Sequence, residues 1–386
     1  MERKGFTMIY LDNCATTKPF PSVIESYRQV SDAYFANPSS IHALGAEVDR
    51  LQQKGREQAA TILDVDPEEI VFTSGGTEGN NIAIKGIAFE HKARGNHIIT
   101  TEVEHPSVYE ACKSLEKHGF HITYLPVNEF GVIDIHHLEQ AITDETILVS
   151  IMHVNNEIGS IQPVLEAGKL LQKYPKITFH VDAVQSLGKV SLPLEQSGID
   201  LCTFSGHKIH GLKGTGILYV RQGTALYPLF HGGGQEREFR SGTENVAGNV
   251  AFVRALRLIK EKEAEHREAL MRKKERMLAR LSEVSGVHIN NPNDGAPHII
   301  NVSVPPLKPE VVIHALYEKD IVISTQSACS SKRSDVSRVL EACGHSLERA
   351  SSGLRISMSY ETTDAEVDEF CEVFPKVIRE LKGIME

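Results

Sequence analysis

The chain has 386 residues, of which 41% are apolar and 24% are charged, and its formal net charge at pH 7 is −10. This length allows two or three domains of about 150 residues, and the composition is that of a globular protein rather than a disordered or fibrous one. The acidic balance argues against a nucleic-acid coat or a protein bound to anionic membranes, and the lack of a signal sequence or of about 18 consecutive apolar residues predicts a cytoplasmic protein.

Short apolar runs alternate with amphipathic stretches from about residue 68 to residue 220. The runs expected to form buried strands are 70–73, 97–101, 122–127, 147–154, 177–182, 201–205 and 216–220. Between them, residues 107–117 and 164–173 have the spacing of amphipathic helices. This alternation predicts a doubly wound α/β domain with a mostly parallel sheet. Ligands of such sheets bind beyond the carboxyl ends of the strands, so residues that directly follow a strand are the first functional candidates.

The pattern changes after Thr243. Residues 250–284 carry apolar side chains three, four and seven positions apart among many charges, which predicts one long helix. We expect strands near 298–304 and 320–325 and a last helix over 364–381. This part of the chain is therefore typical of a smaller α+β region.

The first candidate site follows the expected strand 70–73, where the segment 74–77 (Ser-Gly-Gly-Thr) leads into a helix. Backbone N–H groups at such a turn suit a phosphate, because the helix dipole adds to their partial positive charge. Gly75 and Gly76 allow close approach, and Thr77 adds a hydroxyl. The spacing matches neither a P-loop nor the dinucleotide motif, and a purely structural turn is an equally open interpretation.

Two further predicted strands end at or just before polar residues that are candidates for a function. Asp182 ends an apolar run, where an ionised carboxylate is costly unless it is paired. It either caps the next turn or accepts a hydrogen bond from a protonated ring nitrogen, with Gln185 nearby. Lys208 follows Ser205, Gly206 and His207, and an amine there becomes able to form a Schiff base if burial and nearby cations lower its pKa. Together these sites describe the binding of pyridoxal phosphate.

The cysteines and histidines do not predict a metal site. Six cysteines at scattered spacings form neither a disulfide framework nor a CxxC pair, which favours a reduced, intracellular setting. The 18 histidines include no HExxH motif or ordered His/Cys cluster.

The chain resembles the cysteine desulfurases, which are pyridoxal-phosphate enzymes of the aspartate-aminotransferase fold type. Within this family it is most similar to the group with a long catalytic loop. The motifs that carry the resemblance are 10–17, 37–40, 74–77, 104–105, 154–159, 181–182, 205–208, 232–236 with 240–245, 327–329 and 354–355. The resemblance implies a large cofactor domain over 16–259 with a mostly parallel seven-stranded sheet. It implies a small α+β domain formed by 1–15 together with 260–386, which carries the catalytic-cysteine loop at about 325–338.

The resemblance also implies roles for single residues. Lys208 bonds the cofactor as a Schiff base and moves the substrate Cα proton, Asp182 pairs with the ring nitrogen, and His105 stacks on the ring and shuttles a proton. Residues that contact the ring side or the phosphate are Gln185, Asn156, Gly76, Thr77, Ser205, His207 and, from the neighbouring subunit of a homodimer, Thr243. Arg355 binds the substrate carboxylate, a bidentate task suited to a guanidinium, and Asn156 also touches substrate.

Cys329 is the nucleophile that the resemblance implies. It lies in a polar, serine-rich segment, where Lys332 and Arg333 favour the thiolate. The reaction converts L-cysteine to L-alanine and leaves a persulfide on Cys329 for an acceptor protein in thio-cofactor, tRNA-thiolation or iron–sulfur biosynthesis. The other cysteines are expected to be structural; Cys14, within the motif 10–17, is either a packing residue, which we favour, or an oxidation-sensitive thiol.

Two alternatives stay open at the level of sequence. The first is another pyridoxal-phosphate lyase or aminotransferase of the same fold, such as a selenocysteine lyase, which would not need a nucleophilic cysteine on a long loop. The second is a non-catalytic sulfur carrier with a degenerate cofactor site. The presence of Lys208, Asp182, Arg355 and Cys329 argues against degeneracy.

Overall fold

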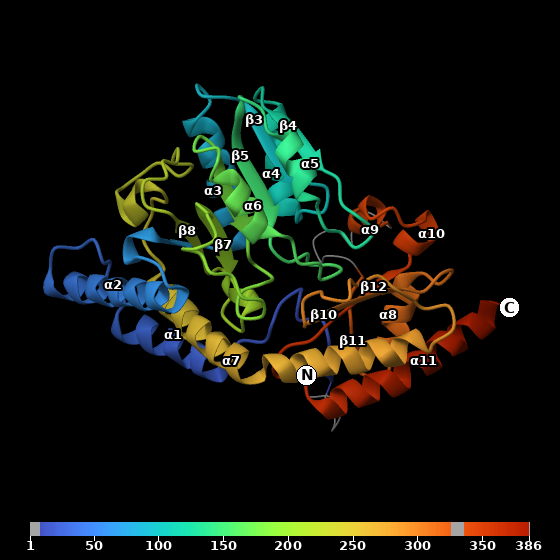
Figure 1. The fold of residues 1–386 in the computed structure, drawn as a ribbon. Helices are drawn as coiled ribbons and strands as arrows, with labels where there is room; N and C mark the ends of the chain where they lie inside the picture. Colours follow the sequence, from blue (N-terminus) through green and yellow to red (C-terminus); the bar gives the residue numbers. More distant parts are fainter. Residues whose placement is uncertain (1–7, 326–335, 386) are drawn as a thin grey trace.

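A seven-stranded sheet lies at the centre of the larger part of the protein in the computed structural model, which describes residues 8–325 and 336–385 (Figure 1). The strands are β2 (Ile70–Thr73), β3 (His97–Thr101), β4 (His121–Leu125), β5 (Thr146–Met152), β6 (Thr178–Asp182), β7 (Leu201–Ser205) and β8 (Gly216–Val220). Their order is β2-β8-β7-β6-β5-β3-β4. Strand β8 is antiparallel to both neighbours and the other pairs are parallel. All seven predicted strands are present, with bounds shifted by one or two residues at β4, β5 and β6.

The sequence of these strands explains their position. Every residue of β5 and β7 is buried, as expected for apolar strands covered by helices on both faces. The edge strand β4 has only its last residue buried. Because β2, β3, β5, β6 and β7 point the same way, the segments that follow them meet at one edge of the sheet.

Helices cover both faces of this sheet (Figure 1). One apolar layer joins α3 (Gly76–Glu90) and α4 (Pro106–Glu116) to the sheet, and it includes Ile82, Ile98 and Val108. The other layer includes Val149, Phe179 and Phe252 and involves the remaining helices of this part. These are α1 (Pro21–Ala33), α2 (Ala43–Leu63), α5 (Ile135–Ala141), α6 (Val164–Leu171) and the start of α7 (Val246–Ser282), with the short 3-10 turns η1 (Pro67–Glu69), η2 (Gly206–Lys208) and η3 (Gln235–Glu238). The predicted helices 107–117 and 164–173 are thus α4 and α6.

Helix α7 begins in the apolar layer that includes Phe252 and continues into a second apolar cluster (Figure 1). It contributes Leu270 and Met277 to this second cluster. The described residues beyond α7, together with the N-terminal segment, form a two-stranded parallel sheet, a three-stranded antiparallel sheet and four helices. The two short helices, at 338–342 and 347–350, pack in a separate small cluster with Met152 and Ile158. The elements are β1 (Ile9–Tyr10) with β11 (Ile321–Val322), then β12 (Gly353–Ser357), β10 (Ile299–Ser303) and β9 (His288–Ile289), and α8 (Pro309–Tyr317), α9 (Arg338–Ala342), α10 (Leu347–Ala350) and α11 (Asp364–Met385).

The predicted long helix over 250–284 is α7, and the predicted last helix, α11, is longer than expected. The strand expected over 320–325 covers only Ile321–Val322, because Ser324 already bridges to Arg355 of β12 rather than to β1. The division into domains at residues 259 and 260 stays a prediction. Among the described residues, no helix combines the length and the apolar character needed to cross a membrane.

Gly168 in α6 offers a test of this packing. A Cβ atom added there would lie 1.7 Å from the carbonyl oxygen of Ser197, a backbone atom that cannot rotate away. We expect Gly168→Ala to lower the free energy of unfolding by about 3 kcal/mol in urea titrations, since overpacking forces the backbone to shift. The control is Gly55→Ala in α2, where no atom lies within 4 Å of the added Cβ; this change is expected to be stabilising by about 0.5–1 kcal/mol. Equal stability of the two variants would contradict the packing described.

Candidate active site

One cavity at the carboxyl edge of the large sheet collects ten of the predicted site residues. It is lined by Gly76, Thr77, His105, Asn156, Asp182, Gln185, Ser205, His207, Lys208 and Arg355. Gly76 follows β2, His105 follows β3, Asp182 and Ser205 end β6 and β7, and Arg355 lies on β12. Four of these candidate residues thus lie at or after strand ends, as the sequence argument expects, whereas Arg355 lies in the middle of its strand.

The turn between β2 and α3 forms one end of the cavity. Gly75 has a φ of 139°, a conformation that favours glycine, and α3 begins without a side-chain cap on its first N–H groups. A Cβ added to Gly76 would lie 2.9 Å from Cγ2 of Val184, so a larger residue would crowd the cavity wall. An uncapped helix N-terminus with Thr77, Ser205 and His207 beside it is a suitable place for a phosphate group.

Asp182 is buried and its two carboxylate oxygens are held separately. The backbone N–H of Val184 donates to Oδ1 at 3.0 Å, and Nδ2 of Asn80 donates to Oδ2 at 2.7 Å. Burial raises the pKa of Asp182, whereas these two hydrogen bonds and the charge of Lys208 lower it. A buried carboxylate held in this way is suited to a cationic N–H partner. Asn80 was not predicted as a site residue; only its place one turn into the helix that follows the glycine turn could have indicated it.

Lys208 extends from η2 toward the N-terminal segment of the chain. Its Nζ donates to the carbonyl oxygen of Ala15 at 2.9 Å and also to that of Cys14. Lys189 donates to the carbonyl oxygen of Lys208 at 3.1 Å, and burial lowers the pKa of Lys189 to about 8. The segment 14–15 and Lys189 therefore fix the turn that presents Lys208 to the cavity. The lysine was predicted from the sequence but these supports were not, since Lys189 lies 19 residues away and Ala15 lies 193 residues away along the chain.

His105 is the N-cap residue of α4. Its Nδ1 accepts from the backbone N–H of Ser107 at 3.2 Å and lies 2.8 Å from Oγ of Ser107. Burial, together with the charges of Lys208 and Arg338, lowers the pKa of His105 to about 3. The imidazole is therefore neutral at physiological pH.

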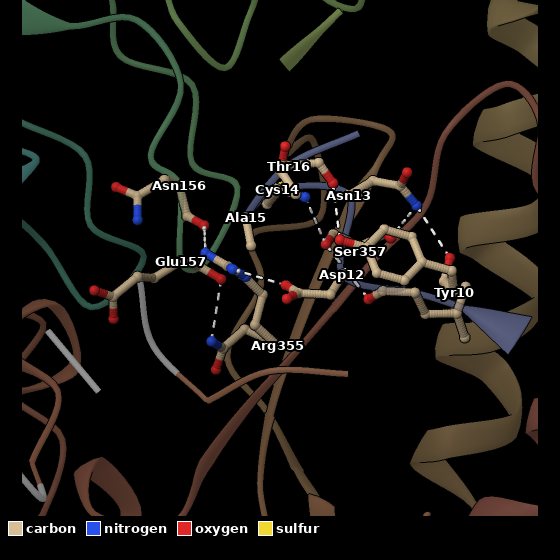
Figure 2. A network of polar contacts seen from close by, with 12 residues as sticks. Tyr10, Asp12, Asn13, Cys14, Ala15, Thr16, Asn156, Glu157, Arg355 and Ser357 are labelled. Carbon is tan, nitrogen blue, oxygen red and sulfur yellow. Dashed lines mark hydrogen bonds and ion pairs between the residues drawn. The ribbon is translucent and has the colours of Figure 1, made fainter. Parts of the chain in front are cut away.

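Arg355 is 1% exposed and lines the cavity, and Figure 2 shows its guanidinium between Asp12 and Asn156. It donates to the carbonyl oxygen of Asn156 at 2.9 Å and to Oδ1 of Asp12 at 3.0 Å. Its Nε has no hydrogen-bond partner among the described residues. The guanidinium is thus positioned by Asn156 and Asp12 and retains a donor for an anionic group. Asp12 was missed at the level of sequence, although it lies in a motif that had been singled out.

Thr243 does not line the cavity of its own chain. It is exposed and lies in the segment after η3, beside Glu236, which makes a buried ion pair of 2.7 Å with Arg56. A role for Thr243 in the neighbouring subunit stays a prediction.

Cys329 lies outside the described residues, but the residues that flank residues 326–335 are placed. Backbone hydrogen bonds of 3.1 and 2.7 Å join Ser324 to Arg355, and Oγ of Ser337 donates to Oε2 of Glu157 at 2.6 Å, next to Asn156. The flanking residue Ser324 therefore contacts the cavity residue Arg355, and Ser337 contacts the neighbour in sequence of the cavity residue Asn156.

The remaining cysteines are free thiols. Cys112, Cys202 and Cys343 are buried, and burial raises the pKa of each thiol, that of Cys343 to about 12. These three are poor nucleophiles. Cys14 is also buried, and it lines the cavity. Among the described residues, no group of three or more His, Cys, Asp or Glu side chains is arranged to hold a metal ion.

Comparison with known proteins gives full-length matches. The family model "Aminotransferase class-V" matches residues 9–370. A protein of Lactobacillus delbrueckii subsp. bulgaricus described as a NifS/IcsS protein homolog is 44% identical over 380 residues, which are 98% of this chain and 99% of that one. The cysteine desulfurase IscS of Methanosarcina thermophila is 41% identical over 377 residues, with coverage of 97% and 93%. The solved structure of a NifS-like protein has a TM-score of 0.91 and 36% identity, with coverage of 97% and 100%.

The match extends from β1 into α11, and the cavity lies within it. The chain therefore belongs to the class-V aminotransferase family. Within that family it is a cysteine desulfurase, as the relatives of that name at 40–41% identity show. The predicted resemblance, fold class and enzyme class are confirmed.

Proposed function

We propose that this desulfurase binds pyridoxal phosphate on Lys208, takes sulfur from L-cysteine through Cys329 and passes it to an acceptor protein. The observation that carries the proposal is the meeting of four groups in one cavity. They are an uncapped helix N-terminus, the Asp182 carboxylate, the Lys208 amine and the Arg355 guanidinium. The alternative of a degenerate carrier is disfavoured because Asp182, Lys208 and Arg355 are each positioned by hydrogen bonds and the helix N-terminus is left open for a phosphate.

The residues present fit the cofactor. The N-terminus of α3, with Ser205 and His207, suits its phosphate, and Asp182 suits its protonated ring nitrogen. Oε1 of Gln185 is buried without a partner among the described residues, while its Nε2 donates to the carbonyl oxygen of Cys14 at 3.1 Å. A buried polar atom without a partner is costly, so a ligand group at this position would satisfy it.

Pyridoxal phosphate, when bound, supplies an electron sink that acidifies the Cα–H bond of an amino-acid substrate. The chain's own residues do the rest. Asp182 accepts a hydrogen bond from the ring nitrogen and keeps it protonated. The Lys208 amine would be the base that takes the Cα proton, and the carbonyl oxygens of Cys14 and Ala15 hold its Nζ. Arg355 and Asn156 orient the substrate carboxylate.

The sulfur transfer itself needs a nucleophile. The Cys329 thiolate attacks the sulfur of L-cysteine, a new S–S bond forms and the substrate C–S bond breaks. The electron pair of that bond stays with the carbon skeleton, which gains protons and leaves as L-alanine. The resulting persulfide on Cys329 then passes its outer sulfur to a thiol of an acceptor protein. The homodimer, in which Thr243 reaches the partner's phosphate site, belongs to this proposal.

The experiment that tests the proposal follows alanine, sulfide and protein persulfide from ³⁵S-labelled L-cysteine, with borohydride reduction of the cofactor adduct in parallel. We expect stoichiometric alanine, a label on Cys329 and a reduced adduct on Lys208. Alanine formation without a label on Cys329 would support another lyase of the fold. A label without an adduct on Lys208 would support a carrier.

Replacing Arg355 by lysine tests the assignment of the carboxylate site. Lysine keeps the charge but loses the planar pair of donors, and it would not hold both Asp12 and the substrate. We expect the KM for L-cysteine to rise by about 10–100-fold, the value of one charged hydrogen bond, with the absorbance of bound cofactor unchanged. Lys213→Arg, the reverse exchange at an exposed position nearby, is the control. An unchanged KM in Arg355→Lys would remove Arg355 from substrate binding.

A further inference from the structure

A chain of hydrogen bonds connects Asp182, at the end of β6, with His105, the N-cap residue of α4. Nδ2 of Asn80 lies 2.7 Å from Oδ2 of Asp182 and 2.9 Å from Oγ of Ser107. Oγ of Ser107 lies 2.8 Å from Nδ1 of His105. Asn80, Ser107 and Asp182 are at most 8% exposed.

The direction of every bond in this chain follows from Asp182. An ionised carboxylate only accepts hydrogen bonds, so the amide of Asn80 must turn its NH₂ group toward it. The two protons of that NH₂ group go to Asp182 and to Oγ of Ser107. The Ser107 hydroxyl, which accepts from Asn80, is left to donate its own proton to Nδ1 of His105. The backbone N–H of Ser107 also donates to Nδ1.

We infer that Asn80 and Ser107 are positioning residues that fix His105 as the neutral tautomer with its proton on Nε2. Nδ1 accepts from Ser107 and therefore carries no proton. Among the described residues, Nε2 has no hydrogen-bond partner, and His105 lines the cavity. The side chain thus enters the reaction as a hydrogen-bond or proton donor to a substrate atom and not as a base. The low pKa of His105, caused by burial and by Lys208, agrees with a neutral ring.

This inference adds a role for His105 to the proposed function. It rests on that function only for the identity of the substrate that contacts Nε2 of His105. The tautomer itself is a property of the folded chain. The tautomer can be measured without turnover. A wrong tautomer assignment can therefore be told apart from a wrong assignment of the desulfurase activity.

The test is ¹⁵N NMR of the full chain with labelled histidine, in which the His105 signals are those missing from His105→Gln. In the wild type we expect the proton on Nε2. Asn80→Asp replaces the NH₂ donor by a carboxylate, to which the Ser107 hydroxyl then donates. The hydroxyl oxygen is left to accept from Nδ1–H, so the ratio of the Nδ1–H to the Nε2–H tautomer is expected to rise about tenfold, the worth of one hydrogen bond.

The matched control is Asn81→Asp, the same change at the next residue, whose Nδ2 donates to the carbonyl oxygen of Thr77 and not to this chain. The tautomer of His105 is expected to stay unchanged there. If Asn80→Asp does not fold, Ser107→Ala removes one of the two donors to Nδ1 and is compared with Ser114→Ala on the same helix. A wild-type proton on Nδ1, or equal tautomer ratios in each variant and its control, would overturn the inference. A tautomer shift in a chain without desulfurase activity would support the inference and refute the proposed function.

Discussion

Lys208→Ala is expected to abolish covalent attachment of the cofactor and to lower kcat by about 10⁴-fold or more, since one change removes both the Schiff-base amine and the base for the Cα proton. The structure supports this size of effect because Lys208 reaches into the cavity from a turn held by Lys189, with its Nζ at the carbonyl oxygens of the segment 14–15. The measurement is borohydride trapping followed by peptide mass analysis, with alanine release as the activity.

The control for this experiment is Lys213→Ala, which removes an exposed lysine five residues further on. It is expected to keep the adduct and the activity. Added methylamine should restore part of the activity of Lys208→Ala, because a small amine can occupy the emptied space and take the proton. A borohydride adduct on another lysine in Lys208→Ala would show that the Schiff base is placed wrongly.

The sheet and the central site residues could be predicted because their signals are local. Asp182 and Ser205 each end a buried apolar strand, and Lys208 follows the second of these strands within a glycine-bounded turn. Parallel strands bring their carboxyl ends to one edge of the sheet, so the proximity of these residues could be predicted without knowing the conformation of the loops. The antiparallel direction of β8 had no such signal. Its sequence is as apolar as that of β7, and only its pairing with β2 and β7 reveals the direction.

The supporting residues could not be predicted because they act over long distances in sequence. Asp12 meets Arg355 across 343 residues, and Asn80 meets Asp182 across 102. Each is a common polar residue whose local sequence would also suit a surface helix or a turn. The structure shows that these partners orient the predicted site residues Arg355 and Asp182.

Cys329→Ser is expected to abolish persulfide formation and to reduce alanine release to background, while the yellow cofactor stays bound. A serine hydroxyl remains protonated near neutral pH, whereas a thiol is more acidic and its thiolate is intrinsically more nucleophilic. Lys208, Asp182 and His207, which we propose to hold the cofactor, are untouched by this change, so the absorbance of the bound cofactor separates a lost nucleophile from a lost site.

Cys371→Ser is the matched control, because Cys371 is half-buried on α11 and does not line the cavity. It is expected to keep full activity and the label from ³⁵S-cysteine. Cys14→Ser is the more demanding comparison, since Cys14 does line the cavity. If Cys329→Ser released alanine and sulfide normally and Cys14→Ser did not, the nucleophile would be Cys14. Loss of label in Cys329→Ser alone would instead establish that sulfur leaves the substrate through Cys329, whose segment is flanked by Ser324 at Arg355 and by Ser337 at Glu157.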